Sequence, residues 1–219
     1  MSNAPRPSKN IEKFLLKLKI DKIYLKNIFT SGEAALKSLQ SKIYGNNFFH
    51  LGPIRDESLY KGLEINKKDL DKADFILCTG LLDNHTNSLL YYKKLLEGHT
   101  DLKMICTNPD LWVHRGLKKE YCAGKLAEIF KELGGEVIYF GKPHKEIYKF
   151  CINKNEKVLV IGDNIRTDIR GANVMNFDSL LITGGVHKNE FINIDLKDYD
   201  KILEKYNVKT NYYQEELNW

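Results

Sequence analysis

The sequence predicts an α/β protein built on parallel β-sheets. Short apolar runs rich in branched residues alternate with longer segments whose apolar residues recur every three or four positions. This alternation is typical of parallel strands joined by right-handed helical crossovers. With 219 residues, 42% of them hydrophobic, the chain is large enough for one mid-sized domain or two small ones.

The branched apolar runs are the predicted strands, at residues 75–80, 102–108, 136–141, 157–163 and 178–185. The predicted helices occupy residues 11–18, 33–40, 88–96, 125–133 and 146–153. Thr30 or Ser31 can cap the second helix, Gly134-Gly135 ends the fourth, and Pro143 suits the first turn of the fifth. In the polar tail, 190–219, we expect one closing helix at 196–206 and loose final residues.

Composition argues against several classes of protein. No apolar run approaches the ~18 residues that span a membrane, and the start, MSNAPRPSKN, lacks the apolar stretch of a signal peptide. The net charge is +5, but acids and bases interleave, whereas nucleic-acid-binding proteins cluster their basic residues. The four cysteines form no C-x-x-C pair and the six histidines no zinc motif. We expect a cytoplasmic protein with reduced, mostly buried thiols and no nucleic-acid or membrane partner.

The strongest chemical signal is KVLVIGDNIRTDIRGAN, residues 157–173. Asp163 follows a predicted buried strand, and Asp168 opens the next helix one turn later. Parallel sheets bind ligands at the carboxyl ends of their strands, and Mg²⁺ takes one or two carboxylates plus water and phosphate oxygens. Asp163 and Asp168 are therefore the predicted metal ligands. The alternative is that Asp168 only caps the helix and Asp163 only serves a turn.

Two further segments offer groups that can bind phosphate. Lys142 follows the strand at 136–141 and precedes a helix, a position from which its ammonium group can neutralise a phosphate. Ser2 and Asn3 precede the first helix and supply a hydroxyl, an amide and backbone N–H groups. The alternatives are a lysine in an exposed turn and a disordered chain start or cloning scar. Neither G-x-G-x-x-G nor G-x-x-x-x-G-K-[ST] occurs, which argues against an unrelated nucleotide-binding protein.

Together these segments resemble the haloacid dehalogenase-like hydrolases, whose motifs run from an Asp-x-Asp strand through a Ser/Thr strand end and a lysine to paired acids. Ser2 resembles the second motif, Lys142 the third, and Asp163 with Asp168 the fourth. The chain looks most similar to subfamily IIA, the sugar-phosphate and nitrophenyl-phosphatase-like group with a C2-type cap. T-S-G-E-A (30–34), T-N-P-D (107–110) and A-G-K-L-A-E (123–128) add to the resemblance.

The resemblance implies a Rossmann-like core of parallel strands, residues 1–42 and 140–219, with an inserted α/β cap, residues 43–139. It implies a Mg²⁺-dependent phosphoric monoester hydrolase acting on a small phosphorylated metabolite. Its catalytic residues would be Lys142 and Ser2, its phosphate-binding residues Ser2, Asn3 and Lys142, and its metal ligands Asp163 and Asp168. Asn108 and Asp110 would contact the substrate from the cap, and a plain N-P-D turn is the alternative there.

One family motif is not found in the sequence. In this family the first Asp of Asp-x-Asp attacks phosphorus and forms an aspartyl-phosphate, and the second is the general acid/base. The Asp-x-Asp triplets here, Asp69-Leu70-Asp71 and Asp198-Tyr199-Asp200, lie in polar, helical-looking surroundings. We therefore expect an N-terminally truncated core that lacks a strand-helix-strand unit of roughly 30 residues and is inactive alone. The missing N-terminal fragment or a second copy of the chain is the expected protein partner. The alternative function is a non-catalytic phosphate- or partner-binding remnant of a split or decayed phosphatase gene.

Overall fold

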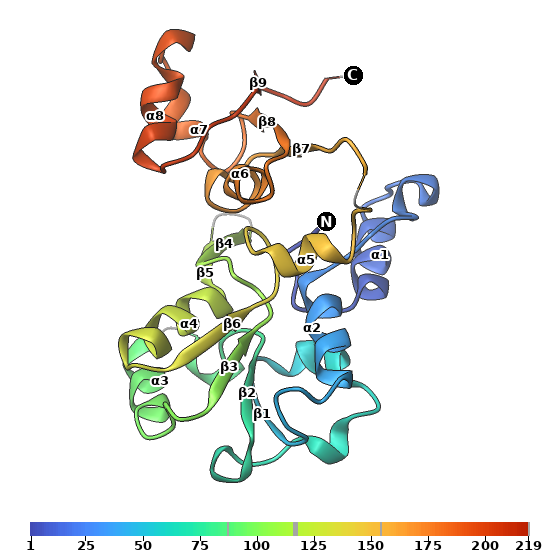
Figure 1. The fold of residues 1–219 in the computed structure, drawn as a ribbon, viewed down its shortest axis with the longest axis vertical. Helices are drawn as coiled ribbons and strands as arrows, with labels where there is room; N and C mark the ends of the chain where they lie inside the picture. The colour runs from blue at the N-terminus through green and yellow to red at the C-terminus, as the bar shows by residue number, and fades with distance from the viewer. Residues whose placement is uncertain (87, 116–117, 154, 219) are drawn as a thin grey trace. The chain divides into compact units, whose positions relative to one another are not determined.

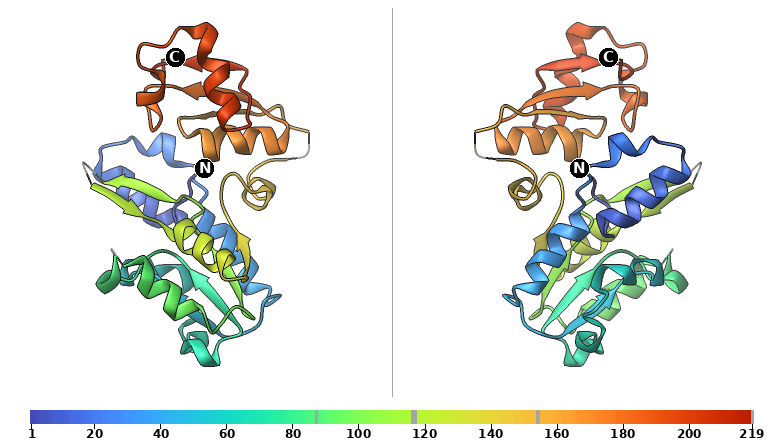
Figure 2. Two further views of the ribbon diagram at one scale, coloured as in Figure 1. Left: turned by 90° about the vertical axis from the view of Figure 1, so that its left-hand side faces the viewer. Right: turned by 90° about the vertical axis from the view of Figure 1, so that its right-hand side faces the viewer.

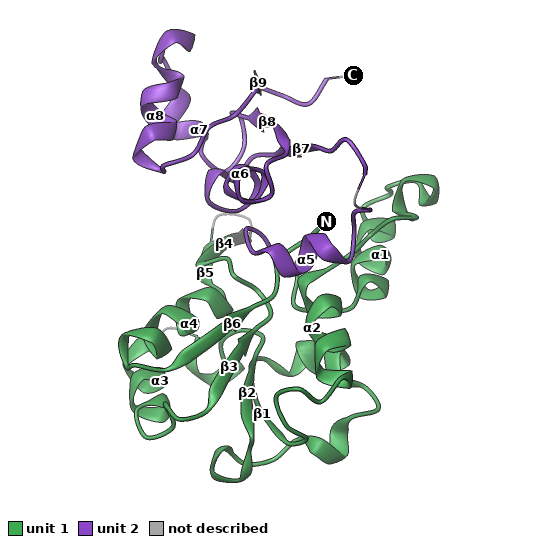
Figure 3. Cartoon of the chain, in the orientation of Figure 1, with its two compact units in different colours: residues 1–141 green, residues 142–219 purple. Residues whose placement is uncertain are grey.

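The computed structural model describes residues 1–86, 88–115, 118–153 and 155–218 (Figure 1). The chain divides into two compact units, Met1–Gly141 (unit 1) and Lys142–Trp219 (unit 2), shown in separate colours in Figure 3. Each unit contains a parallel sheet with helices. The predicted α/β class with parallel sheets is thus confirmed, whereas the assignment of 43–139 as an inserted cap stays a prediction.

Unit 1 is organised around a four-stranded parallel sheet in the order β1-β2-β3-β6. Its strands are β1 (Phe48–Leu51), β2 (Phe75–Cys78), β3 (Lys103–Cys106) and β6 (Glu136–Tyr139). In the register of the sheet, Cys78 is paired with Leu51 on one side and with Cys106 on the other. The carboxyl ends of these strands are therefore aligned, and the loops that follow them emerge at one edge.

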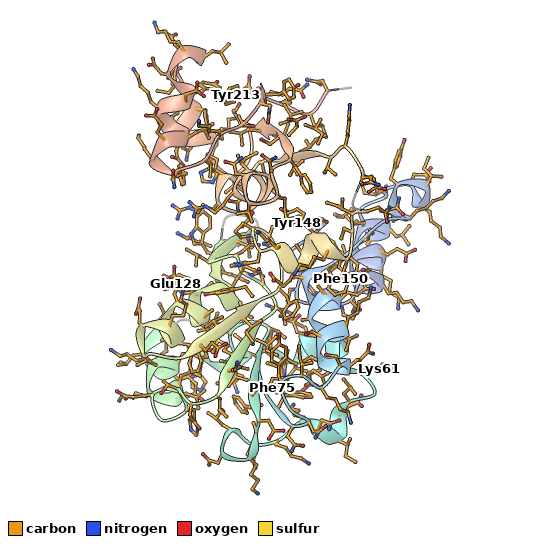
Figure 4. The ribbon with its side chains drawn as sticks, viewed as in Figure 1. Lys61, Phe75, Glu128, Tyr148, Phe150 and Tyr213 are labelled. Atoms are coloured by element: carbon orange, nitrogen blue, oxygen red, sulfur yellow. The ribbon has the colours of Figure 1, made fainter. Side chains whose placement is uncertain are left out.

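Helices cover both faces of this sheet (Figures 1 and 2). Because side chains alternate along a strand, Ile76 of β2 faces α3 (Leu89–Leu96) and α4 (Ala123–Glu132). Its neighbour Phe75, labelled in Figure 4, faces α2 (Ser31–Gln40), and its ring lies 6.0 Å from that of Phe48. Unit 1 thus has two buried cores, one on each face of the sheet.

One helix and one hairpin of unit 1 lie outside this sandwich. The helix α1 (Ser8–Lys17) buries none of its residues, and β4 (Trp112–Arg115) pairs with β5 (Lys118–Tyr121) in an antiparallel hairpin.

Thr30 caps α2 as predicted, since its Oγ1 accepts the Glu33 N–H at 3.1 Å. Gly134, with φ of +97°, lies between α4 and β6, which confirms its predicted role as a helix terminator.

Unit 2 contains a three-stranded parallel sheet in the order β7-β8-β9. The strands are β7 (Leu159–Gly162), β8 (Asp178–Ile182) and β9 (Tyr212–Gln214). The helices are α5 (Lys145–Lys149), a π-helical turn (Ile165–Ile169), α6 (Arg170–Met175), α7 (Lys188–Phe191) and α8 (Tyr199–Lys205). Ile165, Leu181 and Leu203 belong to the core of this unit, while Leu159 and Ile161 of the outer strand β7 remain 48% and 36% exposed.

Several local predictions are wrong. The strand β1 and the β4-β5 hairpin lie outside the predicted strands. The C-terminal residues are not all loose, because β9 pairs with β8, and the Tyr213 hydroxyl (Figure 4) donates to Asp200 at 2.5 Å. Pro143 does not occupy the first turn of α5, which begins at Lys145 after the N-cap residue His144.

Candidate functional site

The loop after β7 positions Asp163 at the carboxyl end of the unit 2 sheet. Its Oδ2 accepts the backbone N–H of Val186 at 3.0 Å, from the loop that follows β8. In the described part of the chain, nothing hydrogen-bonds the other carboxylate oxygen, Oδ1. Asp163 is half-buried, so this oxygen is available to a ligand.

Asp168 occupies a more enclosed position next to Lys142. Its side chain is 8% exposed, and its Oδ1 accepts from Lys142 Nζ at 2.5 Å. Its Oδ2 accepts the Asn164 N–H at 3.1 Å. Asp168 does not open or cap the helix as the sequence suggested, because Asn164 is the N-cap and the π-helical turn begins at Ile165. Both of its oxygens therefore have protein partners, and it orients the Lys142 ammonium group.

Glycines give these carboxylates room. A Cβ added at Gly162 would lie 2.3 Å from Asp168 Cγ. One added at Gly185 would lie 2.2 Å from Asp163 Oδ2 and 2.3 Å from Asp163 Cβ. Since real Cβ atoms do not approach that closely, the position of each acid requires a glycine opposite it.

We expect Gly185→Ala to lower the free energy of unfolding by about 1–3 kcal/mol, the usual cost of overpacking. The new methyl group would meet the Cβ of Asp163, which cannot swing aside as the end of a long side chain can. Gly98→Ala is the matched control, because a Cβ there has no neighbour within 4 Å. Urea denaturation of the two variants measures the difference, and equal midpoints would contradict the expectation.

Unit 1 has a cavity of about 360 Å³ at the carboxyl edge of its sheet. It is bordered by residues that follow β2 and β3, among them Thr79, Asn108 and Asp110, and by the N-terminal residues Ser2 and Asn3. The structure thus brings four sequence-predicted site residues, two from the chain start and two from T-N-P-D, to one cavity.

The polar groups at this cavity are linked to one another. Asn3 Nδ2 donates to Asp110 Oδ1 at 3.0 Å, and Asn108 Oδ1 accepts the Asp110 N–H at 3.1 Å. The Ser2 hydroxyl accepts the Ala4 N–H at 3.2 Å. The N-P-D turn considered as an alternative is therefore present, and it holds Asp110 against Asn3. Ser2 and Asn3 belong to unit 1 and Lys142, Asp163 and Asp168 to unit 2, so their predicted convergence stays a prediction.

Comparisons with known proteins place these residues in a family. The family model described as HAD-hydrolase-like matches residues 139–206, the stretch that contains Lys142, Asp163 and Asp168. A solved hydrolase of the haloacid dehalogenase-like family from Brucella suis 1330 is 30% identical, with a TM-score of 0.78. That alignment covers 90% of this chain and 78% of the other. The chain belongs to the haloacid dehalogenase-like family.

Two other relatives are phosphatases by name. Ribonucleotide monophosphatase NagD of Escherichia coli (strain K12) is 33% identical over 88 residues, which are 38% of this chain. The match spans 34% of NagD, about a third of its length. The p-nitrophenyl phosphatase from Archaeoglobus fulgidus is 19% identical with a TM-score of 0.71, covering 97% of this chain and 80% of the other, and it shares the fold.

Members of the haloacid dehalogenase-like family typically use Mg²⁺, and the oxygens of unit 2 fit that ion in part. Among the described residues, no group of three or more His, Cys, Asp or Glu side chains could hold a metal. Mg²⁺, however, often needs only one or two carboxylates, with waters and substrate phosphate completing its shell. The unengaged Oδ1 of Asp163 meets that minimum, and Asp168, committed to Lys142 and Asn164, is suited to an outer position.

The cysteines are thiols, and His85 packs against an aromatic ring. Cys78, Cys106 and Cys122 are buried and Cys151 is exposed, and burial raises the pKa of Cys106 to about 12. His85 stacks on Tyr91 at 3.7 Å between ring centroids. Within the described ranges, no helix combines the length and the apolar character needed to cross a membrane.

Sequence reasoning missed His50, which hydrogen-bonds Thr79 at the cavity. The signal that could have identified it is a histidine within the apolar run FFHL.

Proposed function

We propose that this chain forms part of a Mg²⁺-dependent phosphomonoesterase that acts on a small phosphorylated metabolite. The observation that carries the proposal is the Lys142–Asp168 pair at 2.5 Å, together with Asp163 at the end of the preceding strand, which keeps one carboxylate oxygen unengaged. All three residues lie within the range matched by the family model. The Lys142 ammonium group, held in place by Asp168, suits a phosphate dianion, and the Asp163 carboxylate suits the Mg²⁺ that accompanies that phosphate.

Each residue has a role in this proposal. Asp163 would hold Mg²⁺, which would neutralise charge on the phosphate oxygens. Lys142, oriented by Asp168, would donate hydrogen bonds to those oxygens, and the Ser2 and Asn3 segment would supply further donors. Asn108 and Asp110 are the proposed substrate contacts, and both border the unit 1 cavity.

We expect Asp163→Asn to weaken Mg²⁺ binding by more than about 100-fold and Asp168→Asn by about 10-fold. Asp163 has the unengaged oxygen, whereas Asp168 acts through Lys142. Isothermal titration of MgCl₂ in the presence of inorganic phosphate measures both effects. Asp195→Asn, in an exposed ion pair with Lys197, is the control. A larger loss from Asp168→Asn would reverse the ranking, and a wild-type chain that binds neither Mg²⁺ nor phosphate would refute the proposed function.

A second function is favoured by the surroundings of the two Asp-x-Asp triplets. Asp69 precedes the short 3₁₀-helix Leu70–Lys72, and Asp198 ends another at Leu196–Asp198. Neither triplet follows a buried strand, the position at which the family carries its nucleophile. A chain that binds phosphate or a partner without hydrolysis is therefore the alternative, and the turnover experiment of the Discussion separates the two.

A further inference from the structure

Two loops of unit 2 are joined at the proposed metal ligand Asp163. The first loop follows β7, carries Asp163 and leads into the π-helical turn Ile165–Ile169. The second follows β8 and leads into α7. A hydrogen bond links them, in which the Val186 N–H of the second loop donates to Asp163 Oδ2 at 3.0 Å. That bond occupies one oxygen of the carboxylate and so determines which oxygen remains for a ligand.

The second loop is anchored by the residue that follows Val186. Val186 is 43% exposed, whereas His187 is 7% exposed. His187 Nδ1 lies 2.6 Å from Glu190 Oε1, and in the described part of the chain its Nε2 has no hydrogen-bond partner. The Glu190 carboxylate therefore holds the His187 ring, and with it the adjacent backbone at Val186.

Tyr206, the C-cap residue of α8, holds Glu190 in this position. Its hydroxyl donates to Glu190, with distances of 2.7 Å to Oε1 and 2.8 Å to Oε2. Its ring packs edge-on against that of His187, with 5.3 Å between centroids. Although burial acts in the opposite direction, hydrogen bonds from His187 and then from Tyr206 keep the pKa of Glu190 below its usual range. Glu190 is therefore an ionised acceptor, and hydrogen bonds to an ionised group are the stronger kind.

Tyr206 also contacts the segment that follows Asp163. The Arg166 guanidinium lies over the Tyr206 ring, 5.1 Å from its centroid, and Arg170 Nη2 donates to the Tyr206 carbonyl oxygen at 2.6 Å. Arg166 belongs to the π-helical turn and Arg170 to α6. From a third segment of the chain, Tyr206 thus contacts both segments that meet at the Asp163–Val186 hydrogen bond.

We infer that Tyr206 is a positioning residue for the proposed Mg²⁺ site. It acts through Glu190 and His187. The result is a Val186 N–H that stays on Asp163 Oδ2 and leaves Oδ1 for the ion. Mg²⁺ demands near-ideal octahedral geometry, so a carboxylate that is already fixed binds it more tightly than one that must first be ordered. The role of the ion rests on the proposed function, whereas the fixing of the Val186 loop stands without any ligand.

The fixing of the loop is tested by amide hydrogen exchange at Val186, followed by NMR on the full chain without ligand. Tyr206→Phe keeps the ring and removes only the hydroxyl. We expect it to speed exchange at Val186 about tenfold, the effect of losing one hydrogen bond to a charged group. Tyr213→Phe is the matched control, because it removes a hydroxyl that donates to Asp200 in the same unit. Exchange at Val186 that is equally fast in the two variants, or as slow in Tyr206→Phe as in the wild type, would overturn the inference.

The route through Glu190 is tested by a double-mutant cycle with the same measurement. Glu190→Gln keeps the shape of the side chain and removes its charge, and it should speed exchange at Val186 to a similar extent. Because the Tyr206 hydroxyl acts through the same carboxylate, adding Tyr206→Phe to Glu190→Gln should have little further effect. If the two effects multiply, Tyr206 acts independently of Glu190 and the inferred route is wrong.

Titration calorimetry with MgCl₂ in the presence of inorganic phosphate measures the consequence for the ion. We expect Tyr206→Phe to weaken Mg²⁺ binding about tenfold, the lower end of the effects seen when outer partners of a metal ligand are replaced. Tyr213→Phe should leave the affinity unchanged. Unchanged Mg²⁺ affinity in Tyr206→Phe would overturn the inference. A wild-type chain that binds neither Mg²⁺ nor phosphate would refute the proposed function and the metal role of Tyr206 with it, while hydrogen exchange decides separately whether Tyr206 fixes the loop.

Discussion

The purified 219-residue chain is expected to hydrolyse phosphate monoesters no faster than its own Asp163→Ala variant. Lys142 and Asp163 are the proposed phosphate and metal ligands, whereas neither Asp-x-Asp triplet follows a buried strand as the family's nucleophile does. Loss of a catalytic nucleophile can cost about 10⁶-fold in turnover even when the binding groups remain. The assay is phosphate release from a panel of monoesters with Mg²⁺.

Addition of a separate strand-helix-strand segment that carries Asp-x-Asp is the complementary test, because the segment supplies a nucleophile. If the chain forms part of a phosphomonoesterase, turnover should appear with the segment and should be lost again in Asp163→Ala. Binding without turnover under both conditions would favour the non-catalytic alternative. Robust turnover by the chain alone, abolished by Asp163→Ala, would contradict the expectation and require a different nucleophile.

The free energy of unfolding of unit 1 is expected to fall by about 3 kcal/mol as the pH drops from 6.5 to 4. His50 titrates near 6.5 when unfolded, but burial lowers its pKa to about 4 in the native structure. Between these values the unfolded state binds more protons, so acid favours unfolding. The stabilising contribution is complete above pH 6.5 and is lost by pH 4. Urea denaturation at a series of pH values measures the slope.

His50→Asn provides the control for this slope. Asparagine cannot titrate in this range, and its amide can still form a hydrogen bond with Tyr60. We expect the variant to have a lower stability at pH 7 and a much flatter dependence between pH 6.5 and 4. A variant with the same slope as the wild type would show that other groups cause the acid sensitivity.

The elements that could be predicted from sequence are those whose pattern is local. The runs FILC and KMIC (residues 75–78 and 103–106) are short, apolar and branched, and both are central strands. Thr30 and Gly134 were found because caps and helix ends depend on adjacent backbone groups. The missed strands depend on distant partners. Tyr212–Gln214 is polar and becomes a strand only because β8 offers it an edge.

The candidate site, like the fold, could be predicted only where its residues follow a local sequence pattern. The positions of Asp163 and Lys142 after strand ends could be predicted, because sequence patterns reveal such positions. The engagement of Asp168 by Lys142 and Asn164 could not be predicted, because the π-helical turn that sets its direction leaves no clear sequence pattern. The same holds for His50, whose partners Tyr60 and Thr79 are 10 and 29 residues away.

The outer strand β7 has a consequence for how the chain must be handled. Leu159 and Ile161 present exposed apolar side chains on a strand with β8 as its ladder partner, and such an edge accepts further strands without much selectivity. During refolding, two copies of the chain would compete with any added segment for this edge, and the outcome would depend on concentration. Mixing the denatured chain with an excess of the segment before dilution therefore gives the added strand its best chance. Both associations are bimolecular, so the ratio of segment to chain decides which of them prevails.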